Sequence, residues 1–142
     1  SLNITSVGLT GYSFTSTVFL KMNITDALWY ETKKTGQVTE GYVGVRVVID
    51  MEGLTPVTGL QKSNFILFQV GGINQTFSLN RYYDSQDHDD GDYPALNKFV
   101  YELRYFYSGQ QTPTSVNVVI GIKDARNIKV TGQATNLSVI EA

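Results

Sequence analysis

The sequence has no cysteine and only one histidine in 142 residues. Without cysteine the chain can form no disulfide, and it has no thiolate to act as a nucleophile or metal ligand. One histidine is little with which to build a Ser-His-Asp relay. The sequence also holds no Gly-x-Ser-x-Gly elbow, no phosphate-binding glycine loop and no His-Glu-x-x-His motif. We therefore predict that the protein is not an enzyme.

Charged residues are scarce as well. They make up 17% of the chain, with 11 cationic against 13 acidic side chains and a formal net charge of −2, whereas about a quarter is usual in a soluble domain. The cations are scattered, while nucleic acids and anionic membranes are held by clustered positive charge. No apolar run reaches the ~18 residues that cross a bilayer. We expect no nucleic-acid partner and no membrane span in this chain.

What the sequence does contain is alternation of apolar and polar residues with the period of a β-strand. The clearest case runs from Val43 to Met51, and similar alternation covers residues 99–107, which are rich in aromatics, and residues 116–122. No apolar stripe of helical period is sustained for three turns. We predict an all-β fold, an antiparallel immunoglobulin-like or pilin-like β-sandwich of seven to nine strands, without the Cys-Trp-Cys pattern of true immunoglobulin domains.

Other segments give less regular patterns. Apolar residues at even positions predict a long strand over residues 12–24. A short helical turn is predicted near residues 27–31, with Thr25 or Asp26 as its cap, and a polar stretch runs from Glu31 to Gly41. The continuous apolar run over residues 65–70 predicts a strand buried on both faces, which Gly71 and Gly72 join to a hairpin partner over residues 73–79. A last strand is predicted at residues 137–140.

One segment is strongly acidic. Five carboxylates lie within nine residues, and Gly91 among them could supply a sharp turn; they belong to Asp84, Asp87, Asp89, Asp90 and Asp92. Oxygen ligands of this kind suit Ca²⁺, although the spacing departs from the EF-hand pattern. Three interpretations stay open: a Ca²⁺ site, a solvated acidic hairpin tip, and a transition-metal site that uses His88. We expect no other bound cofactor.

Tyrosine occurs nine times, and six of these residues surround the acidic segment and the strand after it: Tyr82, Tyr83, Tyr93, Tyr101, Tyr105 and Tyr107. Aromatic platforms on β-sheets can stack against sugars. Tyrosines packed in a core or at its rim, with the hydroxyl at the edge, give the same pattern. Both interpretations stay open.

Four positions fit the acceptor pattern for N-linked glycans, namely Asn3, Asn23, Asn74 and Asn136. Four is more than the Asn, Ser and Thr content would give by chance, although a β protein rich in these residues also forms such patterns by accident. Glycosylation without any disulfide points to a cell surface that does not rely on cysteine, as an archaeal surface would not.

The first eleven residues alternate well enough to form a strand, with apolar side chains at Leu2, Ile4, Val7 and Leu9. Burying these side chains contributes roughly 6 to 12 kcal/mol, whereas ordering about ten residues costs on the order of 15 kcal/mol. The arm therefore also needs ladder hydrogen bonds. It is either the first strand of its own sandwich or a strand donated to a neighbouring subunit, a contact that builds a fibre. We accordingly divide the chain into a donor strand and linker at 1–11 and a β-sandwich domain at 12–142.

Taken together, the cysteine-free β pattern, the alternating arm from Leu2 to Leu9 and the four acceptor motifs resemble the surface filaments of archaea called threads. These filaments assemble by donor-strand complementation and are similar in architecture to type I pilins. The resemblance implies an extracellular cell-surface filament of identical subunits joined head to tail. It also implies heavy N-glycosylation and a role in adhesion or biofilm formation.

A second resemblance is to the membrane-anchored β-sandwich proteins that tie the archaellum to the surface layer. It implies the alternative function, an envelope-anchored binding module that contacts the surface layer or glycans.

Overall fold

The structure is a computed structural model that describes residues 20–51, 55–83, 99–123, 129–131 and 135–142. These residues form one sheet of ten strands, with a short 3-10 helix, η2 (Lys62–Asn64), in front of the fourth. The strands are β1 (Leu20–Thr35), β2 (Val38–Met51), β3 (Thr55–Pro56), β4 (Phe65–Val70), β5 (Ile73–Asn74), β6 (Ser78–Tyr83), β7 (Phe99–Gly109), β8 (Ser115–Lys123), β9 (Lys129–Thr131) and β10 (Thr135–Glu141).

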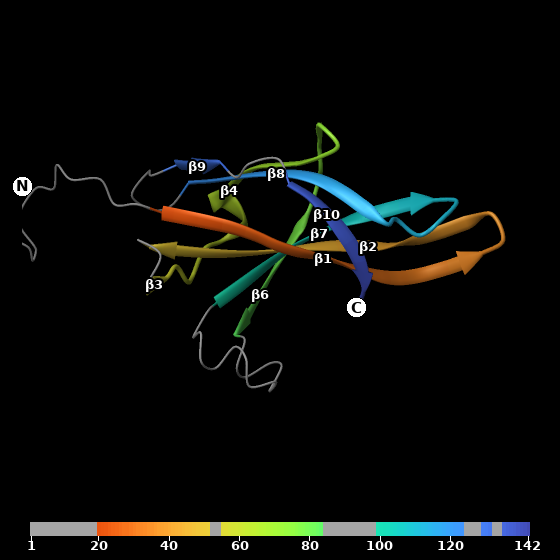
Figure 1. Cartoon of the computed structure of the whole chain (residues 1–142), viewed down its shortest axis with the longest axis horizontal. Helices are drawn as coiled ribbons and strands as arrows, with labels where there is room; N and C mark the ends of the chain where they lie inside the picture. The colour runs from red at the N-terminus through yellow and green to blue at the C-terminus, as the bar shows by residue number, and fades with distance from the viewer. Residues whose placement is uncertain (1–19, 52–54, 84–98, 124–128, 132–134) are drawn as a thin grey trace, which may run out of the picture.

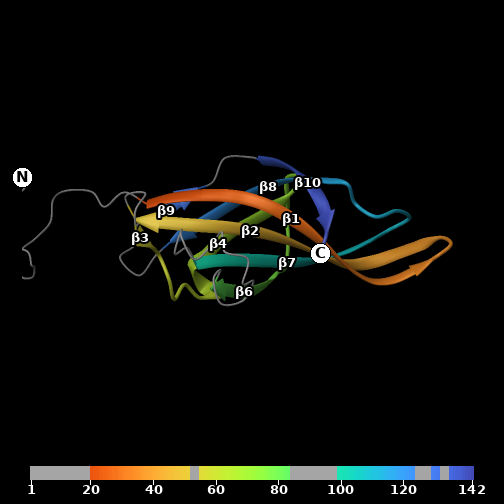
Figure 2. The ribbon, with the colours of Figure 1, turned by 60° about the horizontal axis from the view of Figure 1, so that its bottom comes forward.

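The strands lie in the order β5-β4-β8-β10-β1-β2-β7-β6, with β3 beside β2 and β9 beside β8. Among the described strands, neighbours in this order pair antiparallel, except for β1 and β10, which pair parallel. The sheet curls into a half-barrel, so that β8 and β10 lie on one side of β1, and β7 and β6 on the other (Figure 1, Figure 2). The predicted all-β, mostly antiparallel fold is confirmed, and the parallel pair makes the sheet mixed.

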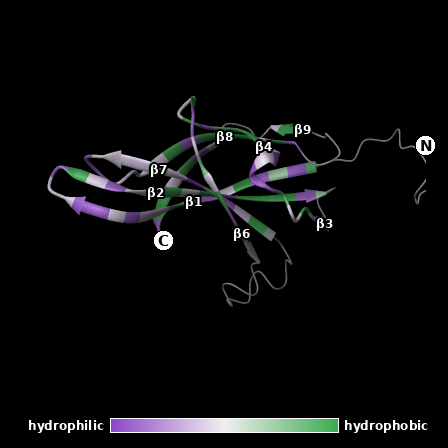
Figure 3. Cartoon of the chain, turned by 180° about the vertical axis from the view of Figure 1, so that it is seen from behind, coloured by the Kyte–Doolittle hydropathy of each residue, from purple (hydrophilic) through white to green (hydrophobic). Residues whose placement is uncertain are grey.

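The core fills the concave, inner face of this sheet. Along β2 every second side chain from Val43 to Ile49 is completely buried, and the buried side chains of β8 alternate in the same way. On β7, Tyr101, Leu103 and Tyr105 are buried on the inner face, and Glu102 between them is buried on the outer face. This alternation appears as bands of apolar and polar colour along the strands (Figure 3). Rings of β4 meet rings of β7 across the core, Phe65 on Tyr101 and Phe68 on Tyr105, with centroids 5.7 and 5.8 Å apart. The alternation predicted for β2, β7 and β8 is confirmed.

The connection between β3 and β4 closes one end of this core. The Tyr101 hydroxyl donates a hydrogen bond to the Val57 carbonyl at 2.8 Å and accepts one from the Leu60 amide at 3.1 Å. Asn64 accepts a hydrogen bond from the Gln61 amide and donates to the Lys123 carbonyl of β8 at 2.7 Å. These bonds tie an irregular segment to both sides of the half-barrel, which satisfies backbone groups that would otherwise be buried unpaired.

The helical turn predicted near residues 27–31 is wrong, and the polar stretch over residues 31–41 belongs to β1, a short turn and β2. β1 continues through this segment to Thr35, turns at residues 36–37 and returns as β2. A register shift between Ile24 and Asp26 moves the inward phase from even to odd positions, so that Ala27 and Trp29 become buried. Because one inserted residue exchanges the two faces of a strand, the alternation is broken in the sequence although the strand is not.

The predictions for residues 65–79 are partly wrong. Gly71 and Gly72 do form the hairpin turn, both with positive φ, and join β4 to β5. However, β4 is buried on one face only, because Ile66 points outward and is 51% exposed. The segment after the turn also does not form one strand: β5 ends at Asn74, and β6 leaves to pair with β7 at the opposite edge of the sheet.

Candidate functional site

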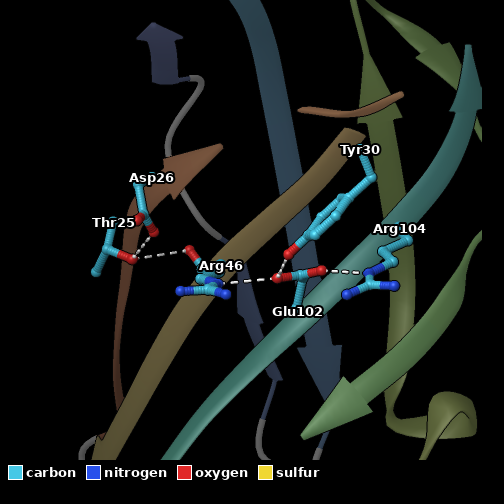
Figure 4. Close-up of polar contacts among 6 residues, drawn as sticks. All are labelled: Thr25, Asp26, Tyr30, Arg46, Glu102 and Arg104. Atoms are coloured by element: carbon cyan, nitrogen blue, oxygen red, sulfur yellow. Dashed lines mark hydrogen bonds and ion pairs between the residues drawn. The ribbon is translucent and has the colours of Figure 1, made fainter. Parts of the chain in front are cut away.

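The outer face of β1, β2, β7 and β6, which points away from the core, carries a buried ionic cluster. At its centre is Glu102 of β7, whose side chain is 0% exposed. Its Oε1 accepts hydrogen bonds from Arg46 Nε of β2 at 2.8 Å and from the Tyr30 hydroxyl of β1 at 2.9 Å. Its Oε2 accepts a hydrogen bond from Arg104 Nε. Figure 4 shows the carboxylate between the two guanidinium groups, with the Tyr30 hydroxyl directed at it.

The sheet makes room for this carboxylate through a glycine. In the ladder between β2 and β7, Arg46 lies opposite Glu102 and Gly44 lies opposite Arg104. A Cβ added to Gly44 would lie 2.5 Å from the carboxyl carbon of Glu102, a distance that real contacts do not tolerate. Glu102 therefore lies over the bare backbone of Gly44, and this close approach is what the glycine provides.

The cluster keeps its charges at neutral pH. Burial by itself would raise the pKa of the Glu102 carboxyl, but hydrogen bonds from Arg104, Arg46 and Tyr30 outweigh it and hold that pKa below its ordinary value. Burial likewise tends to lower the pKa of Arg46, and the hydrogen bond and charge of Glu102 reverse this and raise it. Two guanidinium groups share the Glu102 carboxylate, and Asp26 of β1 lies opposite Arg46 in the ladder between β1 and β2.

Beside the cluster is an open hollow of about 500 Å³, which we call the outer hollow. It is lined by Tyr42, Thr76, Phe77, Ser78, Asn80, Arg104 and Phe106. Phe106 and Tyr42 are 52% and 41% exposed and meet edge to face, with centroids 5.7 Å apart. The guanidinium carbon of Arg104 lies 4.0 Å from the centre of the Tyr30 ring, so Arg104 is held by both a ring and a carboxylate.

A second hollow lies at the end of β7. β6 pairs with β7 only as far as Arg104, and in the described part of the chain no strand follows on that side of residues 105–109. The hollow there, which we call the β7 groove, measures about 440 Å³. Its lining combines apolar side chains such as Val70, Tyr105 and Val116 with polar ones such as Gln75 and Asn117. Burial raises the pKa of Tyr105 to about 12, so its ring is neutral. The β7 groove thus combines a strand edge that no described strand covers with apolar side chains on its floor.

The structure places the predicted site residues as follows. Asn23, Asn74 and Asn136 lie on β1, β5 and β10, and all three are exposed. Asn3, the arm residues Leu2, Ile4, Val7 and Leu9, and the acidic residues Asp84, Asp87, Asp89, Asp90 and Asp92 lie outside the described residues. The donor strand and the Ca²⁺ site stay predictions. Within the described residues, no group of three or more His, Asp or Glu side chains could hold a metal ion.

The tyrosines named from the sequence do not form one exposed platform. Tyr101 and Tyr105 are buried in the core, and Tyr107 is half-buried against Trp29, with ring centroids 5.6 Å apart. Tyr82 and Tyr83 end β6, and Tyr93 is outside the described residues. The exposed rings belong instead to Tyr42 and Phe106. The sequence signal for them was an aromatic residue in the outward phase of a strand, which alternation by itself does not distinguish from an isolated surface residue.

Comparison with protein-family models, curated proteins and solved structures gives no match for this chain. Among the helices that the structure describes, none has the length and apolar character needed to cross a membrane. The two hollows and the side chains around them are therefore the features of the described residues that bear on function.

Proposed function

We propose that this chain is a structural subunit of a glycosylated extracellular filament, assembled head to tail, with a role in adhesion or biofilm formation. In this proposal residues 1–11 of one subunit add a strand to the next. The added strand completes the half-barrel as a pilin-like sandwich. The observation that carries the proposal is the β7 groove, where a strand edge that no described strand covers and apolar side chains on the floor occur together.

The β7 groove offers an added strand two kinds of interaction, main-chain hydrogen bonds and apolar contacts. Residues 105–109 pair with β2 along one edge, and along the edge that no described strand covers every second residue directs its amide and carbonyl outward for main-chain hydrogen bonds. Tyr105 and Val116 offer apolar contacts to every second side chain of an incoming strand. Such hydrogen bonds are what the arm needs, since its apolar side chains alone do not balance the entropy of ordering it. Eleven extended residues reach about 36 Å, which is ample for a ladder of this length.

The arm of a second copy is the occupant that best fits the sequence. Leu2 and Ile4 share one face of an extended strand, and Asn3 and Thr5 the other. Leu2 and Ile4 then meet the groove floor while the acceptor motif at Asn3 points outward, and a bulge at Ser6, where the phase of the alternation slips, would bring Val7 and Leu9 to the floor as well. Because the arm and the groove are different surfaces, the contact repeats without closing, and this arrangement produces a fibre.

The test is to delete residues 1–11. We expect the shortened chain to be a folded monomer that binds a peptide of residues 1–11 added in trans, while the full chain forms filaments. A matched pair sharpens the test: Ile4→Asp should abolish peptide binding, and Thr5→Asp on the opposite face should not. Filaments from the shortened chain, or a full chain that stays monomeric with its arm in its own sheet, would overturn the proposal.

The groove is tested separately with Val70→Lys, which places a charge in its lining. Subunits with this change keep a native arm, so they should cap growing filaments of wild-type protein and shorten them. An unchanged melting temperature is the control for folding. If these subunits polymerise normally, the arm binds elsewhere.

Glycosylation is the second part of the proposal. The exposed side chains of Asn23, Asn74 and Asn136 leave room for a bulky glycan. Intact-mass measurement of protein from its native source should show glycan masses that disappear with Asn→Gln changes at these positions. An unmodified native mass would remove this part of the proposal.

The alternative function, an envelope-anchored module that binds the surface layer or glycans, is favoured by a different observation. The outer hollow, with exposed aromatic rings and a fixed arginine, resembles a ligand site more than a packing surface.

A further inference from the structure

The outer hollow lies on the same face of the sheet as one of the glycan acceptor positions. From Asn74 to Leu79 exposed and half-buried residues alternate, and Asn74, Thr76 and Ser78 are the exposed ones. Ser78 lies opposite Arg104 in the ladder between β6 and β7, and Arg104 is on the outer face. Asn74, Thr76 and Ser78 therefore share the outward phase of this segment, and the last two line the hollow.

The pairing of β5 with β4 fixes the direction of the Asn74 side chain. Asn74 lies opposite Gln69, which follows the buried Phe68 and so points outward. Gln69 Nε2 donates a hydrogen bond to Asn74 Oδ1 at 2.9 Å. An N-linked sugar is attached at Nδ2, so this bond can persist in the glycosylated protein and holds the attachment point on the outer face. An extended chain advances ~3.3 Å per residue, which puts Asn74 roughly 7 Å along the chain from Thr76.

The hollow also contains aromatic rings that the protein leaves partly uncovered. Phe106 and Tyr42 are 52% and 41% exposed although they contact each other edge to face, and both line the hollow. Aromatic rings pack well against apolar surfaces such as the C–H faces of sugars. The side chains of Thr76, Ser78 and Asn80, which also line the hollow, can donate and accept hydrogen bonds as sugar hydroxyl groups require.

We propose that the outer hollow holds the first sugars of an N-linked glycan attached to Asn74 of the same chain. The C–H faces of these sugars pack on Phe106 and Tyr42. Their hydroxyl groups bond to the polar side chains of residues 76–80. This inference rests on the glycosylation part of the proposed function, and it does not need filament assembly.

The covalent link explains how an open hollow can hold a sugar. A free sugar loses translational and rotational freedom when it binds, and an open site gives few contacts in return. A tethered sugar has already lost most of this freedom, and a short link gives it an effective concentration of the order of millimolar. Attachment to a nearby asparagine therefore makes contacts favourable that would hold a free saccharide only weakly.

The glycan needs no charge to occupy this place. Arg104 and Arg46 both pair with Glu102. Asp26 lies opposite Arg46 in the ladder between β1 and β2, so the ionic cluster beside the hollow contains charges of both signs. The aromatic rings and the hydroxyl and amide groups that line the hollow are neutral. Ring packing and hydrogen bonds are thus the interactions that hold the sugars.

The other described acceptor positions lie farther from the hollow. Asn136 is on β10, which is separated from β7 by β1 and β2. Three strand spacings of about 4.8 Å put it ~14 Å away across the sheet. Asn23 precedes Tyr30 by seven residues on β1, and Tyr30 is the residue opposite Tyr42, so Asn23 is roughly 20 Å away along the strand. Glycans at these two positions begin outside the hollow.

The experiment is a double-mutant cycle on the full glycosylated chain, with the melting temperature as the measurement. Peptide mass spectrometry first establishes whether Asn74 carries a glycan. Asn74→Gln should lower the melting temperature by about 3 °C in the wild-type background and by less than about 1 °C in the Phe106→Ala background. Such non-additivity is expected of groups in contact. Tyr42→Leu repeats the cycle with the second ring should Phe106→Ala fail to fold.

Asn136→Gln is the matched control, because it removes a glycan from another part of the same sheet. Its effect on the melting temperature should be the same with and without the Phe106 ring. The cycle of Asn74→Gln and Phe106→Ala is also repeated on protein produced without glycans. There the two effects should add, since only the side chains change.

The outcomes separate this inference from the proposal on which it rests. If Asn74 carries a glycan and its removal changes the melting temperature equally in both backgrounds, this inference is wrong and the glycosylation part of the proposed function stands. If Asn74 is unmodified in the native protein, both are wrong at this position. Coupling of equal size between Asn136→Gln and Phe106→Ala would also contradict the inference, because the effect would not belong to the hollow.

Discussion

The two faces of β7 are packed in different ways, one against apolar side chains and the other against charged and polar ones. Inward, Tyr101, Leu103 and Tyr105 are buried among apolar side chains. Outward, Glu102 is just as completely buried, but among charged and polar partners, Arg46, Arg104 and Tyr30. The inner face is stabilised by removing apolar area from water, roughly 1.5–3 kcal/mol for a large side chain. The outer face must first offset the loss of hydration of a carboxylate.

Because of this difference, the inner face contributes mainly to the stability of the fold, and the outer face mainly to the positions of particular side chains. An apolar core tolerates similar residues of similar volume, whereas the outer cluster requires one carboxylate, two guanidinium groups and a glycine beneath them. Replacing a buried ion pair by apolar residues is often neutral for stability. We infer that the inner face determines whether this sheet folds, and that the outer face determines where Arg104 points.

The largest effect is expected on the inner face. Leu103 is completely buried, between Val45 of β2 and Leu79 of β6 in the ladder. Leu103→Ala should lower the free energy of unfolding by about 4 kcal/mol, through lost burial and a residual cavity. Urea denaturation measures the change. A loss below about 1 kcal/mol would mean that the core is not closed around this position.

The next effect concerns the outer cluster. Glu102→Ala should cost about 3 kcal/mol, because it leaves two neighbouring arginines without their carboxylate. The combined change Arg46→Met, Glu102→Leu and Arg104→Met should restore stability to within about 1 kcal/mol of the wild type. Thermal and urea unfolding of both variants make the comparison. If the triple variant is as unstable as the single one, the cluster stabilises the fold as the core does.

Acid should weaken the outer face and spare the inner one. The pKa of Glu102 is lower in the folded chain than its ordinary value of 4.5, so the unfolded chain takes up the proton first as pH falls. The stability that Glu102 contributes is complete above about pH 4.5 and is lost as pH falls through its folded pKa. The stability difference between wild type and Glu102→Gln should therefore shrink below pH 4.5, as followed by urea unfolding at several pH values. A difference independent of pH from 7 to 3 would contradict the lowered pKa.

The smallest effect concerns one hydroxyl of the cluster. Tyr30→Phe keeps the ring against Arg104 but removes the hydrogen bond to Glu102, which should cost about 1 kcal/mol. Tyr42→Phe, on the same face and 41% exposed, is the control and should stay within about 0.5 kcal/mol of the wild type. Equal losses in the two variants would mean that the Tyr30 hydroxyl has no particular role.

The strands that could be predicted are those whose alternation is uninterrupted. β2, β7 and β8 each keep one phase of apolar residues from end to end, so period two was enough to give the strand and its inner face, although β7 also buries Glu102 on its outer face. β1 could not be predicted in the same way, because the register shift near Thr25 reverses its phase. β6 was assigned to the wrong neighbour, since the choice between β4 and β7 is made by packing across the half-barrel and not by the sequence near the turn.

The candidate site, too, could be predicted from the sequence only in part. The sequence assigned Glu102, Arg104 and Phe106 to one face of a strand, but alternation predicts that residues in this outward phase are exposed to solvent. That Glu102 is buried depends on Gly44 of one strand and Tyr30 of another, which reach it only through the pairing of β1, β2 and β7. Partners far apart in the chain leave no local pattern.

By itself, then, the sequence determined that this chain is all β and that the side chains of β2, β7 and β8 alternate between two faces, because period two follows directly from the geometry of an extended chain. Only the tertiary structure decided that the sheet is a half-barrel with a parallel pair, that the end of β7 has a free edge in the described residues, and that a carboxylate lies buried on the outer face. These features depend on which strands become neighbours. That choice rests on the summed packing and hydrogen bonding of the whole sheet, and no single segment contains it.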